Sequence, residues 1–281
     1  MISGTATTAA LSLGAAGIWG GGDFAGGIAT KRVNVFRVVA GAHACGLILM
    51  LAMAWATGEP MPPRSSLLWG AIAGITGAFG IAALYKGLAI GRMGVVAPVA
   101  SVITAVLPVL FGFRTEGMPE RLQLLGFGLA LVSIWLIARP DGEIDSHRGL
   151  GLAILAGVMF GLFLVSGKQA GHHGIFWPLV SARAASTVLM LAIVAFSPRD
   201  SRPLRPAFVP ILLSGLFDSG ANAMFIAATR HGRLDVAAVL SSLYPASTVI
   251  LARMLLKERI SRMQTVGIAG ALVAVALISA R

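Results

Sequence analysis

Charged residues are scarce in this chain of 281 residues. Only 12% of the residues are Asp, Glu, Lys or Arg. Soluble domains carry roughly 25% charged residues, so the composition excludes an ordinary soluble domain. With 57% hydrophobic residues and a mean hydropathy of +0.85, the chain is typical of a protein that crosses a membrane several times.

Cysteine is almost absent as well. Cys45 is the only one, which excludes an intrachain disulfide and a zinc site built from cysteines. His172 and His173 are adjacent, but no carboxylate is placed by sequence to complete a metal site with them. We therefore expect no metal and no cofactor.

Acidic residues are outnumbered two to one, since 22 Lys and Arg face 11 Asp and Glu, giving a net charge of +11. The basic residues are spread between apolar segments rather than gathered in one patch. Membrane lipids with anionic headgroups are therefore the expected partners, and nucleic acid is not.

Apolar segments of membrane-spanning length account for nearly all of the chain. They are too long and too uniformly apolar for the strands of a membrane barrel, so we expect helices. No Lys or Arg precedes Lys31, and the first apolar stretch continues to about Ala29, which favours a spanning helix over a signal peptide. The expected fold is an all-α integral membrane protein with ten transmembrane helices, at about residues 9–30, 35–56, 66–90, 94–114, 121–139, 149–170, 176–196, 207–230, 235–256 and 263–280.

The two halves of the chain repeat one another. A shift of 141 residues aligns several identical residues: Gly20 with Gly161, Gly74 with Gly215, Ser101 with Ser242, Gly91-Arg92 with Gly232-Arg233, and Gln123 with Gln264. Each unit, residues 1–140 and residues 141–281, holds five helices, and an odd number makes the second copy enter the membrane from the opposite side. Such a 5+5 inverted repeat is typical of secondary transporters with a site at the bilayer midplane. A duplicated inert bundle is the alternative.

Glycines spaced four residues apart predict close helix packing. They are Gly22 and Gly26, Gly70 and Gly74, Gly157 and Gly161, and Gly167 and Gly171. The consecutive run of glycines 20–22 is different, because it weakens a helix and predicts a bend or a backbone exposed to a cavity.

Motifs in both halves carry a resemblance to a known family. The stretch from Leu243-Tyr-Pro to Lys-Glu-Arg259, with Gln264 after it, has a shorter equivalent from Leu107-Pro108 to Glu116, and Trp19-Gly20 lies in the first segment. The chain resembles the drug/metabolite transporter superfamily in its ten-helix EamA-like branch. This implies movement of a small-molecule substrate by alternating access, and we expect an exporter in the cell (inner or plasma) membrane. The resemblance does not supply the substrate.

Asp218 is the first candidate for a binding site, because it lies near the middle of an apolar segment where a charge costs roughly 2.5–3.5 kcal/mol. Asn222 follows one helical turn later and shares its face. Asp218 is either a proton carrier, a counter-charge to a cationic or zwitterionic substrate, or the partner of Arg183 in a buried ion pair. A transport site could contain that pair.

Asp23 is a second intramembrane carboxylate. It is either a further protonatable group in the same cavity or is neutralised by Lys168 or by nearby backbone groups. Protons are accordingly a second expected partner.

Aromatic and hydroxyl side chains near segment centres complete the candidate substrate-binding set: Trp19, Phe79, Phe160 and Tyr244, and Ser101 and Ser242 beside the prolines Pro98, Pro108 and Pro245. Proline frees backbone carbonyls, and the broken helices that result often line transport cavities. Core packing and ordinary kinks are the alternatives. His43 is expected to be a buried histidine rather than a proton relay.

Rival functions have little support in the sequence. No nucleophile with its base, no paired acids and no metal ligands stand at useful spacing, so an enzyme is not expected. A channel or a scaffold remains as the alternative. Lys and Arg number seven on the side of the termini and fourteen on the other, which places the termini outside, whereas the resemblance implies a cytoplasmic location, which we favour.

Overall fold

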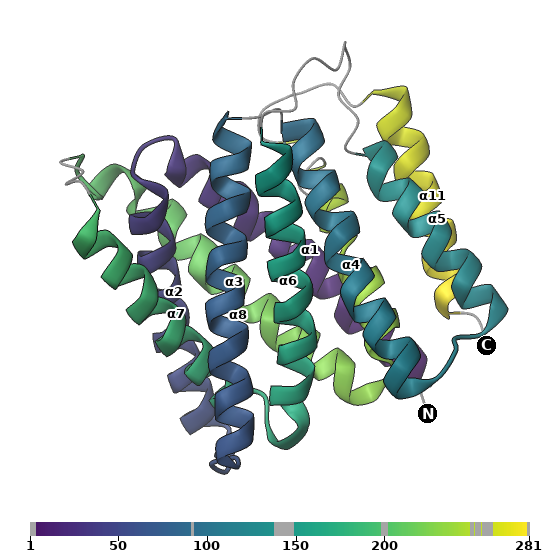
Figure 1. Cartoon of the computed structure of the whole chain (residues 1–281), viewed down its shortest axis with the longest axis horizontal. Helices are drawn as coiled ribbons and strands as arrows, with labels where there is room; N and C mark the ends of the chain where they lie inside the picture. Colours follow the sequence, from purple (N-terminus) through teal and green to yellow (C-terminus); the bar gives the residue numbers. More distant parts are fainter. Residues whose placement is uncertain are drawn as a thin grey trace.

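The computed structural model describes residues 4–90, 93–137, 149–197, 202–247, 250, 254 and 261–279, and within these ranges it contains helices and connections but no strand. The first half has five helices, α1 (Gly4–Thr30), α2 (Val35–Ala56), α3 (Arg64–Ile90), α4 (Met93–Glu116) and α5 (Arg121–Ile137). The second half has α6 (Leu150–Ala170), α7 (Phe176–Phe196), α8 (Phe208–His231), α9 (Leu234–Ser241) and α11 (Arg262–Ser279), with short 3-10 turns at Gly171–His173 and Arg205–Ala207. Figure 1 shows the bundle with both termini at one end.

The all-α membrane class predicted from sequence is confirmed. Six of the described helices, α2, α3, α4, α6, α7 and α8, are long and apolar enough to cross a membrane, and α5 and α11 are shorter apolar helices. The predicted segment 235–256 is represented by α9, and most of its second half lies outside the described residues.

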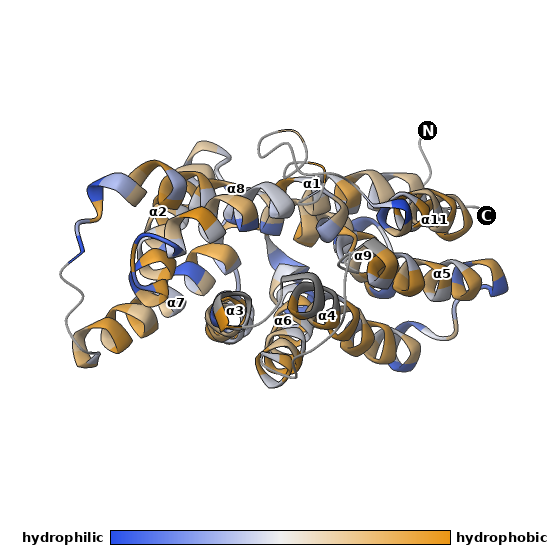
Figure 2. Cartoon of the chain, turned by 90° about the horizontal axis from the view of Figure 1, so that it is seen from above, coloured by the Kyte–Doolittle hydropathy of each residue, from blue (hydrophilic) through white to orange (hydrophobic). Residues whose placement is uncertain are grey.

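The helices form two layers with a helix pair or group at each end. Seen from above, α1 and α8 lie in one layer and α3, α6 and α4 in the other (Figure 2). The pair α2 and α7 closes one end of the two layers, and α9 with the pair α5 and α11 closes the other. The two layers are therefore joined at their ends, and the region between them lies at the centre of the bundle.

Helix contacts come in pairs that interchange when the two halves are exchanged. The contact of α1 with α8 corresponds to that of α6 with α3, the contact of α3 with α7 to that of α8 with α2, and the contact of α4 with α6 to that of α9 with α1. The remaining large contacts, α2 with α7, α4 with α9 and α5 with α11, each correspond to themselves. The two halves are thus built alike and are intertwined rather than placed side by side.

The repeated glutamines perform the same local task in both halves. The side-chain oxygen of Gln123 accepts the backbone N–H of Glu120 at 3.2 Å, and that of Gln264 accepts the backbone N–H of Ser261 at 2.9 Å. Each bond satisfies an N–H group at the start of a helix, as in a capping box. The Gln pair is therefore a structural feature of the repeat.

Close backbone contacts confirm the role expected of most of the spaced glycines. Gly74 of α3 lies against the carbonyl group of Ala182 on α7, and its repeat equivalent, Gly215 of α8, lies against the carbonyl group of Ala42 on α2. Any side chain at either position would meet backbone atoms of the neighbouring helix. These contacts hold α3 to α7 and α8 to α2 at equivalent places.

The run of glycines 20–22 lies inside a continuous helix, since α1 extends from Gly4 to Thr30. Gly20 and Gly22 are buried, and Gly22 also lines a small pocket between α1, α2, α3 and α8. Gly20 approaches Ser247 and the carbonyl of Tyr244, and Gly22 approaches Asp218 and Phe217 of α8. The glycines let α1 touch neighbours on two sides, and this packing offsets their low helix propensity.

The break expected near proline is found in the second half. Helix α9 ends at Ser241, a turn follows at residues 242–243, and helical structure resumes at Tyr244. Pro245 has no N–H to donate to the Ser241 carbonyl, and the next backbone bond, from Ala246 to the carbonyl of Leu243, spans three residues. The first-half equivalent, α4, continues as one helix through its two prolines. The two halves therefore differ here, because the helix is interrupted in the second half and continuous in the first.

Two glycines of α8 allow a matched test of this packing. Gly215→Ala is expected to lower the melting temperature of the detergent-solubilised protein by roughly 3–10 °C, because the new methyl group overlaps the backbone of α2. Gly220→Ala, on the same helix with open space around it, should leave the melting temperature unchanged or slightly raised. Equal melting temperatures for the two variants would contradict the packing role of Gly215.

Candidate functional site

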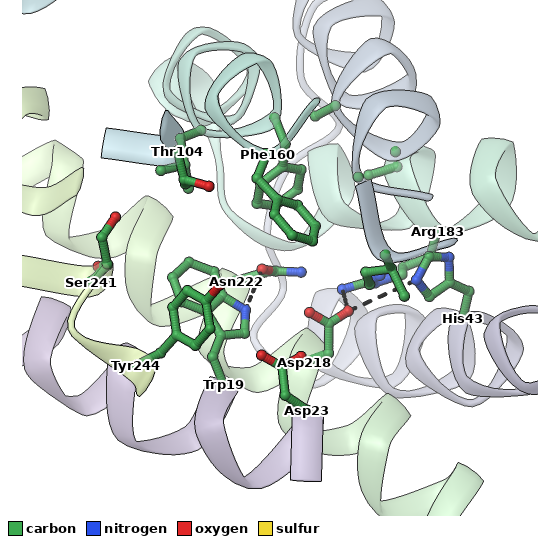
Figure 3. Close-up of a pocket in the computed structure, with 18 residues that line it drawn as sticks. Trp19, Asp23, His43, Thr104, Phe160, Arg183, Asp218, Asn222, Ser241 and Tyr244 are labelled. Carbon is green, nitrogen blue, oxygen red and sulfur yellow. Dashed lines mark hydrogen bonds and ion pairs between the residues drawn. The ribbon is translucent and has the colours of Figure 1, made fainter. Parts of the chain in front are cut away.

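A cavity lies between the halves of the bundle, and the empty space of the cavity together with its opening to solvent is about 700 Å³. Eight of the described helices contribute to its wall, together with the turn after α9. Figure 3 shows its polar side chains at two ends with aromatic rings between them. The lining residues are Trp19, Asp23, His43, Ala73, Gly74, Gly77, Ile81, Thr104, Phe160, Phe163, Leu164, Ala182, Arg183, Asp218, Asn222, Ser241, Ser242 and Tyr244.

An ion pair occupies one end of the cavity. The Arg183 Nη2 atom lies 2.5 Å from Asp218 Oδ2, and the arginine is 5% exposed. The pairing of these two residues, considered from sequence as an alternative to a free carboxylate, is thus present, and it lies in the cavity wall. His43 Nε2 is 3.9 Å from the same Asp218 oxygen, and the imidazole is buried. Its nitrogens make no hydrogen bond within the described residues.

Trp19 and Asn222 join the two helices of one layer. The indole Nε1–H of Trp19 donates to Asn222 Oδ1 at 3.0 Å, and the Trp19 ring also packs on Phe225, with ring centroids 5.9 Å apart. Asn222 is buried and lies one turn from Asp218 on α8, so both side chains face the cavity as predicted. The bond fixes the Trp19 ring as part of the wall.

Asp23 lies on α1 one turn beyond Trp19 and lines the same cavity, next to Asp218 (Figure 3). Its carboxylate makes no ion pair or hydrogen bond to any residue in the described part of the chain. Neutralisation by Lys168 was the wrong alternative, because Lys168 pairs with Glu116 at the end of α4. Asp23 is therefore the carboxylate of this cavity without a cationic partner among the described residues.

The broken helix supplies the opposite end of the cavity. Ser242 lies in the turn after α9, and Tyr244 begins the helical segment that follows. The Ser242 hydroxyl is buried and makes no hydrogen bond within the described residues. Ser101 is buried on α4 beside the Tyr244 hydroxyl and stands behind the lining rather than in it. The break after α9 thus turns two polar side chains toward the cavity.

Of the four central aromatics, Phe79 is the one that does not reach the cavity. Its side chain is 43% exposed on α3, whose cavity face is formed by Ala73, Gly74, Gly77 and Ile81. Depth in the membrane can be estimated from a segment's centre, but the direction of a side chain depends on its angular position on the helix. Phe79 lies two residues from Gly77 and so points away from it.

Several lining residues escaped the sequence prediction. Phe163 and Leu164 follow Phe160 at helical spacing on α6, and this periodicity could have revealed them. Gly77 is the repeat equivalent of Asp218 and lines the same cavity. Small residues at such positions make room for a ligand but carry no chemical signal in a sequence rich in glycine and alanine.

No metal site is visible in the part of the chain that the structure describes. No group of three His, Cys, Asp or Glu side chains there could hold an ion. His172 is exposed and shares a hydrogen bond with Gln169 at 3.1 Å.

The cavity can hold a compact amphipathic solute. Its aromatic and aliphatic walls provide apolar contact, and charged or hydroxyl groups at two ends fix an orientation, which is the usual composition of a small-molecule site. Carboxylates inside a membrane bundle mark solute or proton pathways more often than structural positions.

Comparison with known proteins agrees with this geometry. The model of the EamA-like transporter family matches the chain twice, over residues 6–139 and residues 147–280. The chain belongs to the EamA-like transporter family. The resemblance inferred from the proline, glutamate and glutamine motifs is therefore confirmed.

The fold has a solved counterpart. A crystal structure of a protein 17% identical in sequence superposes with a TM-score of 0.79, covering 97% of this chain and 96% of that chain. At this identity the likeness concerns the fold alone. Comparison with curated proteins gave no match. As a multi-pass membrane protein of a transporter family, the EamA-like chain has a small molecule as its expected cargo.

The Arg183–Asp218 pair can be tested by a double-mutant cycle. Arg183→Met should destabilise the EamA-like protein by about 3 kcal/mol, because it leaves the Asp218 carboxylate without its partner. Adding Asp218→Asn should restore most of the loss, as measured by thermal unfolding in detergent. A single variant as stable as the parent would show that the pair contributes nothing to the fold.

Proposed function

We propose that this EamA-like protein is a secondary transporter that exports a small metabolite or drug-like solute by alternating access. The observation that carries the proposal is the cavity, because it lies between two repeated halves, is lined by both, and contains carboxylates among apolar helices. A binding site at the centre of such a repeat can be opened to either side by relative motion of the halves.

The inverted arrangement of the units 1–140 and 141–281 is part of this proposal. Its support is the exchange of helix contacts between the halves, together with the self-corresponding pair α5 and α11. The start of α5 and the chain's C-terminus lie at the same end of the bundle in Figure 1, as an antiparallel pair requires. Two inverted copies supply two related conformations, each open to one side.

Polar contacts close the end of the bundle that carries the termini, here called the terminal face. Glu116, at the end of α4, pairs with Lys168 of α6 and accepts the backbone N–H of Leu234 at 3.0 Å. Arg233 donates to the carbonyls of Glu116 and Gly117 at 3.0 and 2.7 Å. These bonds connect the end of α4, in the first half, with α6 and the start of α9 in the second half.

A buried acid completes the terminal-face contacts. Arg233 also pairs with the fully buried Asp235, at 3.0 and 2.6 Å, and Asp235 packs on Gly112 of α4. The repeat does not duplicate this arrangement, since the positions 141 residues before Lys168 and Asp235 are Gly27 and Gly94. We propose that these contacts form a latch that favours the conformation closed at the terminal face.

Proton coupling is the further element of the proposal. Asp218 is held by Arg183, whereas Asp23 has no such partner among the described residues, so Asp23 is the better proton carrier of the two. An exporter that exchanges protons for solute needs one carboxyl group that is accessible from the cavity.

Counterflow tests the transport function. Amino acids, sugars and cationic drugs that raise the melting temperature of the purified protein are first selected, and each is then loaded into proteoliposomes. We expect saturable accumulation of the labelled solute against an unlabelled internal pool, and faster movement when a pH gradient is imposed. Single-channel currents instead would indicate a channel, and a chemically altered solute an enzyme. Counterflow indifferent to the pH gradient would remove proton coupling alone.

The latch can be tested without a substrate. In a Cys45→Ala background, spin labels at Met118→Cys and Arg230→Cys, both exposed near the terminal face, report its opening by double electron–electron resonance. Lys168→Met should add a population of longer distances, because the partner of Glu116 is lost.

The control for this measurement is Lys86→Met, which removes an exposed charge from the opposite end of α3 and should change nothing. Distances that stay the same in Lys168→Met and in Arg233→Gln would contradict the latch.

A further inference from the structure

The ionisable groups that line the cavity carry unequal charge. Asp23 and Asp218 are two carboxylates, and Arg183 is the one guanidinium among the lining residues. His43 is buried beside that guanidinium, and a proton on its ring would place a second positive charge in the same unsolvated space. With a neutral His43 and both carboxyl groups ionised, the wall has an excess of one negative charge.

The guanidinium group of Arg183 already has an anionic partner. Arg183 is buried and lies 2.5 Å from Asp218. A carboxylate or phosphate solute would have to displace Asp218 from this pair and leave a second unpaired acid next to Asp23. Removing one partner from a buried pair costs several kcal/mol, so the wall discriminates against anions.

The excess negative charge lies beside an aromatic surface. Asp23 follows Trp19 by one turn on α1, so the two side chains face the cavity together. The Trp19 ring is held in place by its bond to Asn222, and Phe160 and Tyr244 lie across the cavity from one another (Figure 3). A cation near a carboxylate and an indole face gains both ionic and cation–π attraction.

The other end of the cavity offers hydrogen bonding without charge. The Thr104 hydroxyl donates to the carbonyl of Ala100 at 2.7 Å, and the Ser241 hydroxyl donates to the carbonyl of Ser12 at 3.3 Å. The Ser242 hydroxyl is buried and makes no hydrogen bond to any residue that the structure describes. Ser242 is therefore the available polar contact at this end.

We infer that the solute is a monovalent organic cation, a protonated amine with an apolar or aromatic body, whose ammonium group binds Asp23. The inference rests on the proposed transport function, since it assigns the chemical class of solute to the same cavity. The ammonium group supplies the positive charge that the wall lacks, the body contacts the rings of Trp19, Phe160 and Tyr244, and a small polar group at the far end reaches Ser242.

A series of four probes with a common phenyl ring separates charge from shape. They are 2-phenylethylamine, 2-phenylethanol, 3-phenylpropanoate and phenylalanine, with a positive, no, a negative and a balanced charge. Their dissociation constants are measured by calorimetry on the protein in lipid nanodiscs. We expect the amine to bind at least about tenfold more tightly than each of the other three.

Two variants locate the charge. Asp23→Asn should weaken binding of 2-phenylethylamine by about tenfold and leave that of 2-phenylethanol unchanged. Asp218→Asn frees Arg183 and should raise the affinity for 3-phenylpropanoate, an effect that a merely structural role of Asp218 would not produce. The series on the parent protein stands by itself if either variant fails to fold.

The outcomes separate this inference from the function on which it rests. If the acid, the alcohol or the zwitterion binds as tightly as the amine, or if the amine does not bind, the cationic class is wrong. Counterflow of another solute through the same protein would still support transport in that case. If the protein binds the amine selectively but shows no counterflow of any solute, the preference for a cation is supported and the proposed transport function is contradicted.

Discussion

An ionised carboxylate within a bundle of apolar helices costs several kcal/mol unless an opposite charge or hydrogen-bond donors compensate it. Two carboxylates line the cavity of this protein and one guanidinium faces them. The Arg183–Asp218 pair ties α7 to α8 and neutralises one acid. Asp23 is left facing the open space. The polarity of the cavity and its preference for a positive charge depend on this imbalance.

The symmetry of the chain builds the frame, and single departures from it provide the chemistry. Equivalent glycines, Gly74 and Gly215, bring equivalent helix pairs into backbone contact, so the two halves enclose a space between them. Within that space Gly77 lies where the second half has Asp218. On the terminal face Lys168 stands where the first half has Gly27. At both places one half has a glycine and the other half has a charged residue. The repeated residues thus build the helix packing, and the charged residues that differ between the halves supply the polar contacts.

The fold could be predicted from the sequence because it depends on properties averaged over whole segments. Segment length, hydropathy and the shift of 141 residues predicted the all-α membrane class, and the proline, glutamate and glutamine motifs predicted the family. Glycine spacing indicated contact but not the partner. For the run 20–22 the burial between two neighbours outweighed the weak helix propensity that the sequence suggested.

The site was less accessible to sequence reasoning because it depends on direction. Asp218 and Asn222 could be placed on one face by their spacing, and eight of the ten candidate residues line the cavity. Phe79 lies near the centre of its segment, but its position around the axis of α3 directs its side chain away from the cavity. From the sequence, Lys168 could have formed an ion pair with Asp23 or with another acid. The packing of α6 on α4 is what places it beside Glu116.

We propose that a solute binds in the cavity between the halves. A cryo-electron microscopy structure of the protein in nanodiscs with a saturating amine probe tests this most directly. We expect density for the probe inside the cavity, with its nitrogen within hydrogen-bond distance of the Asp23 carboxylate and its ring against Trp19. Probe density confined to the outer surface, or a cavity filled by side chains alone, would contradict it.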